Sequence, residues 1–133
     1  MSTLPLVRDY MDKVVPTVRP ETDIYEAVSY LLDNHVTGAP VVDEHGAVIG
    51  MLTEYDCLRL LAEGIDADVA RGRVEDFMTK KVQTIPSRMN VYFAAGIFVG
   101  NRFRRLPVVD DGKLVGAITR FDILRAVKKN MSR

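Results

Sequence analysis

The chain has 133 residues, 47% hydrophobic and 27% charged, which is typical of a globular domain and argues against extensive disorder. Its 18 Lys and Arg residues balance 18 Asp and Glu residues, so the total charge argues against nucleic acid or a membrane as the main partner. A single cysteine, Cys57, excludes an intrachain disulfide, and the longest apolar run, 91–99, is too short to span a bilayer. The first residues lack a signal-peptide pattern, so we expect a cytoplasmic protein.

An internal repeat organises this sequence. Matching segments lie 67 residues apart, as in Tyr10-Met11 with Phe77-Met78 and 39–43 with 106–110. One residue is then lost from the second turn, after which 50–59 matches 116–125. Self-similarity of this length predicts two copies of one structural unit, over 7–66 and 74–131, within a single module spanning 1–133.

The first elements of each copy are an extended piece and a helix. Residues 17–18 and 84–85 form the extended pieces, and Asp23 and Asn90 are the expected N-caps of the helices. Apolar residues recur at helical spacing, which predicts the core positions Ile24, Ala27, Val28, Leu31 and Leu32 in the first copy and Val91, Ala94, Ala95, Phe98 and Val99 in the second.

A hairpin and a closing helix complete each copy. β-branched runs predict the hairpins, 40–42 with 48–49 and 107–109 with 114–115. The expected core positions of the closing helices are Leu58, Leu61, Ile123, Leu124 and Val127. The order strand, helix, strand, strand, helix, repeated twice, predicts a mixed α/β (α+β) fold, with 62–73 as the connector between the copies.

Both copies pass from the second hairpin strand into the closing helix through Thr-x-x-Asp, at Thr53 to Asp56 and Thr119 to Asp122. A Thr hydroxyl can cap the first helical N–H groups, and a carboxylate is favourable in the first turn. A helix start also binds anions, so a phosphate could meet the Thr while the Asp accepts from a sugar diol. A capped helix explains one such motif; two copies in register favour a ligand.

The tandem repeat, with its Pro-Val-Val-Asp strands at 40–43 and 107–110 and its Gly-x-x-Thr-x-x-Asp motifs, resembles the cystathionine-β-synthase (CBS) domain family. Two domains in tandem resemble a stand-alone Bateman module, which implies pseudo-symmetric repeats packed through their small sheets. The resemblance implies a regulatory sensor of AMP, ADP or ATP, with S-adenosylmethionine and NAD as further candidates, acting on an unknown effector protein. The alternative is a structural or protein-interaction module without nucleotide.

The resemblance also implies two ligand clefts, each combining residues of both repeats. One cleft joins Ile118, Thr119 and Asp122 to Thr22, Val36, Thr37 and Gly38; the other joins Thr53 and Asp56 to Met89, Phe103, Arg104 and Arg105. In the cleft with Asp56, Met89 stands where the first repeat has Thr22, so a hydrogen-bond donor to the ligand is lost. Glu54 stands where the second repeat has Arg120, and its negative charge repels phosphate. The cleft with Asp122 is therefore expected to bind, and the one with Asp56 to be weaker.

A basic cluster lies close in sequence to the favoured motif, made of Arg102, Arg104, Arg105 and Arg120. The guanidinium fork suits phosphate, and we predict nucleotide contacts for Arg104, Arg105 and Arg120. The alternative is a set of solvated strand-edge charges. His35 and His45 lack a further ligand at metal-binding spacing, so no metal site is predicted. Cys57 is expected to be a small core residue, and no residues are predicted to be catalytic.

Helix 91–100 carries a second apolar stripe, made of Phe93, Gly96, Ile97 and Gly100. The matching positions of the first repeat are polar or aromatic: Glu26, Ser29, Tyr30 and Asp33. A helix that is apolar on two faces needs two packing partners. We therefore expect a homodimer through this helix; the alternative is a deeper seat in the core.

Overall fold

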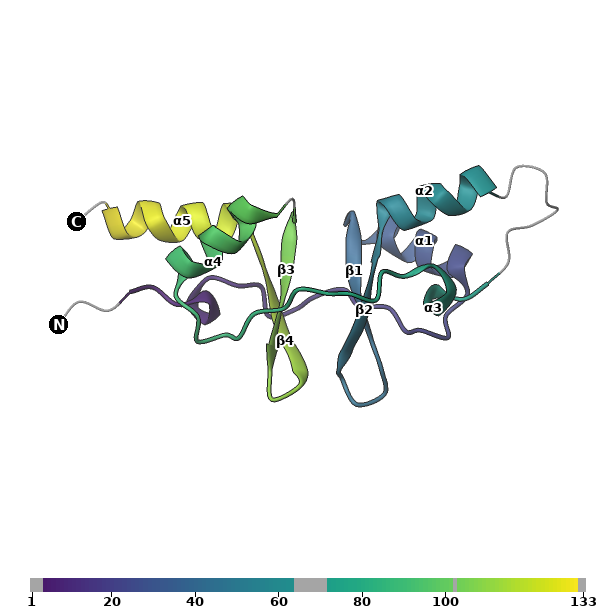
Figure 1. The fold of residues 1–133 in the computed structure, drawn as a ribbon, viewed down its shortest axis with the longest axis horizontal. Helices are drawn as coiled ribbons and strands as arrows, with labels where there is room; N and C mark the ends of the chain where they lie inside the picture. Colours follow the sequence, from purple (N-terminus) through teal and green to yellow (C-terminus); the bar gives the residue numbers. More distant parts are fainter. Residues whose placement is uncertain (1–3, 64–71, 102, 132–133) are drawn as a thin grey trace. The chain divides into compact units, whose positions relative to one another are not determined.

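The computed structural model describes residues 4–63, 72–101 and 103–131 (Figure 1). Arg102 and most of the predicted connector, 64–71, therefore lie outside the described residues. The chain divides into two compact units: unit 1 comprises residues 1–15 and 83–133, and unit 2 comprises residues 16–82. Within the described ranges, no helix is long and apolar enough to cross a membrane.

Unit 2 is built on a two-stranded antiparallel sheet of β1 (Gly38–Val42) and β2 (Val48–Thr53). Its helices are α1 (Ile24–Asp33), α2 (Glu54–Glu63) and the short α3 (Val74–Phe77). The predicted cap of α1 is confirmed, because the Asp23 carboxylate accepts from the amides of Tyr25 and Glu26 at 3.0 and 3.2 Å. The predicted extended piece is a single bridge, in which Val18 pairs with Val41.

Unit 1 repeats this arrangement with β3 (Arg105–Asp110) and β4 (Lys113–Thr119). Its helices are the 3-10 turn η1 (Val7–Asp9), α4 (Val91–Gly100) and α5 (Arg120–Met131). Asn90 caps α4 by accepting from the amide of Phe93 at 2.9 Å, as predicted. The two sheets are antiparallel and each carries helices, which confirms the α+β class.

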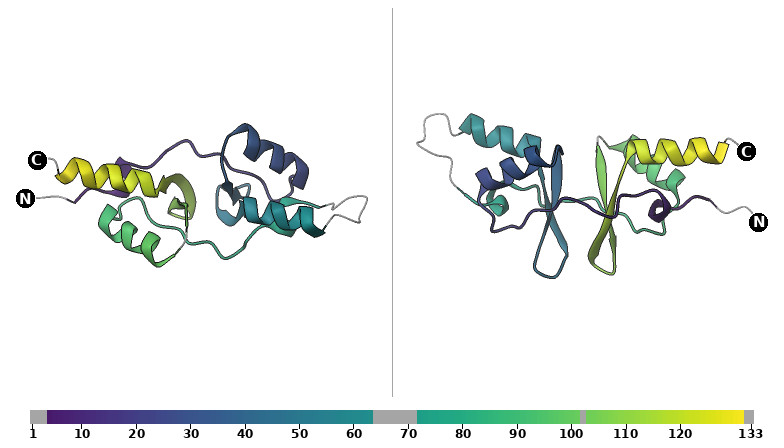
Figure 2. Two further views of the ribbon diagram at one scale, coloured as in Figure 1. Left: turned by 90° about the horizontal axis from the view of Figure 1, so that it is seen from above. Right: turned by 180° about the vertical axis from the view of Figure 1, so that it is seen from behind.

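Each unit is completed by a segment of the other repeat, which the sequence did not predict. In unit 1, Val7 is fully buried in the core formed with α4 and α5, and Asp12 exchanges backbone hydrogen bonds with Ala117 at 2.9 and 3.0 Å. In unit 2, Val74 is buried and Thr79 exchanges two backbone hydrogen bonds of 2.8 Å with Met51. Figure 2 shows the N-terminal segment, in purple, running beside the elements of the second repeat.

The closing helices bury a different face from the predicted one. On α2 the buried apolar residues are Cys57 and Leu60, whereas Leu58 and Leu61 are 58% and 60% exposed. On α5, Ile123 is buried and Val127 packs against the core as predicted, but Leu124 is 62% exposed. The predictions for Leu58, Leu61 and Leu124 were wrong because the Asp of each motif turns inward. The residue after it then faces the core.

The outer residues of the first helices also differ from the prediction. Leu32 at the end of α1 is 69% exposed and Val99 at the end of α4 is 88% exposed, although both were expected in the core. The remaining predicted positions lie in or against the cores of their units: Ile24, Ala27, Val28, Leu31, Val91, Ala94, Ala95 and Phe98. Periodicity therefore identified the inner face of each helix, and the predicted stripe was too wide at its outer edge.

We expect Ser87→Ala to raise the pKa of Asp110. The Ser87 hydroxyl and then its amide donate to this carboxylate and hold the pKa below its usual value of about 3.9. A lowered folded pKa adds stability above the unfolded pKa and loses it as pH falls through the folded value. Carbon NMR titration of the carboxyls should show the rise. The matched control is Asp43, whose pKa is lowered by the amides of Ala47 and His45 and should stay fixed.

Candidate functional site

The predicted motif of unit 1 forms a reciprocal helix cap at the start of α5. The amide of Thr119 donates to Oδ2 of Asp122 at 2.8 Å, and the amide of Asp122 donates to Oγ1 of Thr119 at 3.2 Å. Asp122 is only 6% exposed, which is unusual for a carboxylate. The strand therefore leads directly into the helix, with a buried negative charge at the positive end of the helix.

Arg125 is a partner of Asp122 that was not predicted from the sequence. Its guanidinium donates to Oδ1 of Asp122 from one turn further along α5. The arginine is largely exposed, so the ion pair joins a buried carboxylate to a solvated cation. Asp-x-x-Arg recurs in unit 2 as Asp56 and Arg59, and this spacing was the signal available in the sequence.

The corresponding carboxylate of unit 2, that of Asp56, accepts more hydrogen bonds. Its Oδ2 accepts from the amide and from the hydroxyl of Thr53 at 2.9 and 3.0 Å. Its Oδ1 accepts from the hydroxyl of Thr79 at 3.4 Å, and Nη2 of Arg59 lies 3.9 Å away. Thr79 reaches this position because the 74–79 segment of the second repeat belongs to unit 2. The two motifs thus share the same backbone geometry, but their carboxylates accept different numbers of hydrogen bonds.

The hydroxyl groups of Thr53 and Thr119 also differ, in whether they donate a hydrogen bond within the protein. Thr53 donates its hydroxyl hydrogen to Asp56. Among the described residues, the hydroxyl of Thr119 accepts from Asp122 and has no acceptor for its own hydrogen. A hydroxyl whose hydrogen is not already donated to another group can donate it to an anion at the helix start. This difference favours the motif at Asp122, which is also the one expected to bind from the sequence.

Arg105 adds a cation beside the same motif. Arg105 of β3 lies opposite Thr119 of β4, and its Nη2 pairs with a carboxylate oxygen of Asp12 at 3.5 Å. Its Nε is buried and has no hydrogen-bond partner among the described residues. A buried donor of this kind costs stability until it finds an acceptor. Arg104 and Arg120 are exposed, whereas Arg105 is half-buried.

The other predicted residues of unit 1 have mainly packing roles. Ile118 is fully buried, and Phe103 and Met89 pack against the core.

In unit 2, Val36 packs against the core, the carbonyl of Thr37 accepts from the amide of Glu54 at 2.8 Å, and Gly38 lies opposite Thr53. Thr22 is half-buried. The predicted grouping of Asp122 with Thr22, Val36, Thr37 and Gly38 takes residues from both units and stays a prediction.

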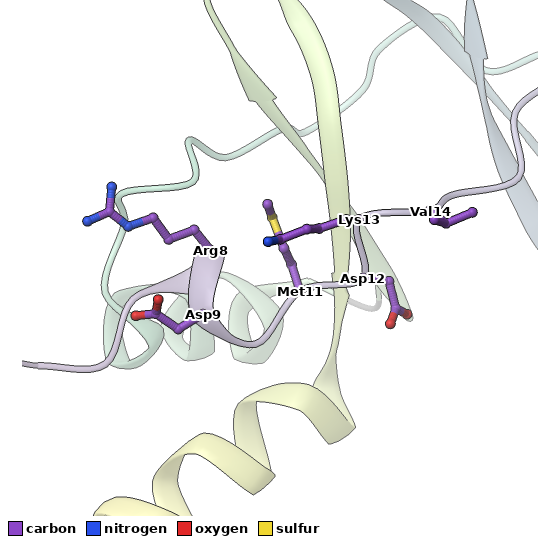
Figure 3. Close-up of a pocket in the computed structure, with 6 residues that line it drawn as sticks. All are labelled: Arg8, Asp9, Met11, Asp12, Lys13 and Val14. Atoms are coloured by element: carbon purple, nitrogen blue, oxygen red, sulfur yellow. The ribbon is translucent and has the colours of Figure 1, made fainter.

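A hollow of about 570 Å³ lies along the N-terminal segment of unit 1 (Figure 3). Its lining residues are consecutive or nearly so: Arg8, Asp9, Met11, Asp12, Lys13 and Val14. Figure 3 shows that Arg8 and Asp12 point away from one another, so the charges do not converge on one ligand atom. None of the residues predicted to bind a nucleotide lines it. In the described part of the chain, no group of three or more His, Cys, Asp or Glu is placed to hold a metal.

Cys57 is buried beside Asp56, as expected for a packing residue. Burial raises the pKa of its thiol, and the charge of Asp56 raises it further. A raised pKa suppresses the thiolate, which is the reactive form. The environment of Cys57 is therefore the opposite of the one that activates a nucleophile.

Comparisons with known proteins give the family. A model of the CBS domain matches residues 7–63 and 74–129. The uncharacterised protein MJ1225 of Methanocaldococcus jannaschii is 36% identical over 119 residues, which are 90% of this chain and 41% of that protein. The chain thus spans less than half the length of that relative.

Among the crystal structures that resemble the chain over nearly its whole length are two that contain adenosine compounds. One is CBSX2 of Arabidopsis thaliana in complex with AMP, 34% identical, covering 97% of this chain and 99% of that one, with a TM-score of 0.83. The other is the CBS domain pair of MJ0100 with 5'-methylthioadenosine and S-adenosyl-L-methionine, 29% identical, covering 96% and 99%, with a TM-score of 0.81. The chain belongs to the CBS domain family and carries two copies of the domain in tandem.

Proposed function

We propose that this protein is a regulatory module that binds an adenosine compound at the start of α5 and signals its presence to a separate effector protein. Relatives that were crystallised with AMP, or with 5'-methylthioadenosine and S-adenosylmethionine, support an adenosine ligand. The observation that carries the proposal is the buried Asp122 beside a Thr119 hydroxyl with a hydrogen to donate. We place the protein in the cytoplasm, where a single thiol stays reduced.

The chemistry of this helix start suits a nucleotide phosphate and a ribose. A carboxylate has about four lone-pair sites, so Asp122 can accept from ribose hydroxyls while it keeps its bonds to Thr119 and Arg125. The Thr119 hydroxyl and the Nε of Arg105 are donors suited to phosphate oxygens. The positive end of the α5 dipole favours the same negative charge.

A protein-interaction module without nucleotide is the second candidate. It is favoured by one observation: both carboxylates already accept from a backbone amide and lie beside an arginine, so each helix start is capped without a ligand. On this alternative the motifs serve only to join strand to helix. The two candidates differ in whether added nucleotide stabilises the folded protein.

We expect AMP, ADP, ATP, S-adenosylmethionine or NAD to raise the melting temperature in a screen. A ligand that binds only the folded state, at 100 times its Kd, adds about 2.7 kcal/mol of stability. Isothermal titration calorimetry should then show affinity that falls as salt rises, if phosphate charge contributes. No heat and an unchanged melting temperature with all five compounds at millimolar concentration would leave the interaction module as the function.

The proposal includes a homodimer that uses α4. Phe93 is 64% exposed, and a side chain built at Gly96 or Gly100 would meet nothing within 4 Å, so this face is open to a partner. Ile97 is half-buried and packs against the core of its own unit, so its substitution would also affect the stability of the monomer. Phe93 is therefore the cleaner probe of the interface.

Phe93→Glu is expected to weaken dimerisation at least tenfold, because the association would bury an unpaired charge. Sedimentation equilibrium across a concentration series measures the effect. Val14→Glu is the matched control, since Val14 is 90% exposed, belongs to the same unit and lies outside α4. A wild-type protein that sediments as a monomer at tens of micromolar would refute the dimer while leaving the ligand proposal standing.

A further inference from the structure

The neutral total charge conceals two oppositely charged units. By sequence, unit 1 has twelve Lys and Arg residues against five Asp and Glu residues, a net charge of +7. Unit 2 has six Lys and Arg residues against thirteen Asp and Glu residues, a net charge of −7. An asymmetry of this size between two parts of one chain points to an interaction driven by charge.

The helices carry much of this asymmetry. In unit 1, α4 has no charged residue and α5 has four basic residues and one acidic residue. In unit 2, α1 and α2 together have five acidic residues and one basic residue. Taken together, α4 and α5 therefore have a net charge of +3, all of it from α5, and α1 and α2 have a net charge of −4. Figure 1 shows that α1 and α2 lie toward the open end of the β1–β2 hairpin, away from its turn.

Each set of helices also exposes large apolar side chains at matching positions of the repeat. Phe121 and Leu124 of α5 are 77% and 62% exposed, and Tyr55 and Leu58 of α2 are 79% and 58% exposed. Exposed apolar residues surrounded by charge are typical of an interaction surface. Here the apolar residues are equivalent in the two units, whereas the charges around them have opposite sign.

We propose that two copies of this chain pair with unlike units in contact, so that α4 and α5 of unit 1 in one copy meet α1 and α2 of unit 2 in the other. The inference rests on the proposed homodimer and specifies its orientation. About a twofold axis the same contact occurs twice, which uses the charges of both units. Pairing of like units would instead place +7 against +7 and −7 against −7, and like charges across an interface are unfavourable.

Charge reversal tests the orientation. Lys128→Glu changes an exposed residue of α5, and Asp33→Lys changes an exposed residue of α1. Each variant alone should dimerise about tenfold more weakly than the wild type, because one reversal is repeated at two contacts. Mixing the two variants should restore association to within a few-fold of the wild type. In the mixed dimer one contact pairs the two reversed charges with each other and the second contact keeps both native charges, so attraction operates at both.

Matched controls and labelling make the result specific. Lys113→Glu and Glu44→Lys make the same charge changes at exposed positions beside the hairpin turns, away from the helices, and should leave dimerisation nearly unchanged. One partner is labelled with ¹⁵N so that native mass spectrometry distinguishes mixed dimers from the two homodimers. Circular dichroism and melting curves establish that every variant is folded.

The possible outcomes separate the inference from the dimer on which it rests. A wild-type dimer that weakens with added NaCl, together with rescue on mixing the variants, supports unlike-unit pairing. A dimer that strengthens with NaCl, or one in which Lys128→Glu pairs best with the wild type, overturns it in favour of like-unit pairing. A wild-type monomer refutes the dimer as well. Binding of a mixed-sequence DNA duplex that is lost in Lys128→Glu, with dimerisation insensitive to every reversal, would assign the charge of unit 1 to a polyanion and overturn the inference.

Discussion

Gly116→Val is expected to destabilise the protein by about 3 kcal/mol, because β4 has no room for a side chain at this position. A Cβ atom built there would lie 2.6 Å from the backbone oxygen of Asp12 and 2.7 Å from the sulfur of Met11. The Asp12 oxygen accepts from the amide of Ala117 at 3.0 Å, so it can move away only by losing that hydrogen bond. Urea unfolding followed by circular dichroism measures the loss.

Gly50 is the equivalent glycine of unit 2 and gives a graded comparison. Its nearest neighbour is the sulfur of Met78 at 2.6 Å, with the backbone oxygen of Thr79 further away at 3.0 Å. A flexible methionine side chain yields more easily than backbone, so Gly50→Val should be destabilising and milder than Gly116→Val. Gly96→Ala is the control, since an added Cβ meets nothing within 4 Å and should stabilise α4 by about 0.5–1 kcal/mol. Equal stability of wild type and Gly116→Val would refute the close approach of the N-terminal segment to β4.

Asp122→Ala is expected to lower the affinity for the adenosine ligand at least tenfold, whereas Asp56→Ala should have a smaller effect. Losing a charge-assisted hydrogen bond to the ribose costs about 1.5–3 kcal/mol. Asp56 already accepts hydrogen bonds from the amide and hydroxyl of Thr53 and from the hydroxyl of Thr79, so fewer of its lone pairs remain for a ligand. Calorimetric titration of both variants with the compound that gives the largest thermal shift compares the two affinities.

Stability has to be measured beside affinity, because both substitutions also remove a helix cap. Each is expected to cost about 1 kcal/mol from capping alone, so a lower melting temperature carries no information about the ligand. Asp122→Asn provides a milder variant that keeps the size of the side chain while removing its charge. Loss of binding in folded Asp56→Ala, with full binding in folded Asp122→Ala, would show that the working site has been assigned to the wrong repeat.

The balance of 18 basic and 18 acidic residues shows how a total can mislead. It argued against a polyanionic partner for the whole chain, yet the division into units separates +7 from −7. The same separation can be read from the two repeats of the sequence, because the segments that they exchange, residues 1–15 and 74–82, each carry two basic and two acidic residues and leave both net charges unchanged. A neutral total therefore does not exclude two strongly charged halves, and the charge of each repeat has to be counted separately.

The repeat, the hairpins, the caps at Asp23 and Asn90 and both Thr-x-x-Asp motifs could all be predicted from the amino-acid sequence. Apart from the repeat, which is read by comparing the chain with itself, each depends on contacts within a short stretch of chain, where side-chain chemistry and backbone hydrogen bonding act locally. The reciprocal bonds of Thr119 and Asp122 follow from a spacing of three residues.

The segment that completes each unit, and the face that each closing helix buries, were set by packing between distant parts of the chain. Arg105 meets Asp12 from 93 positions away, and Thr79 meets Asp56 from 23 positions away. Local patterns contain no information on such pairings, whose cost is the closure of a long loop. On α2, apolar residues lie on two faces, so periodicity alone could not distinguish the core residues Cys57 and Leu60 from the exposed Leu58 and Leu61. The strand that leads into the helix made that choice, by turning Asp56 inward.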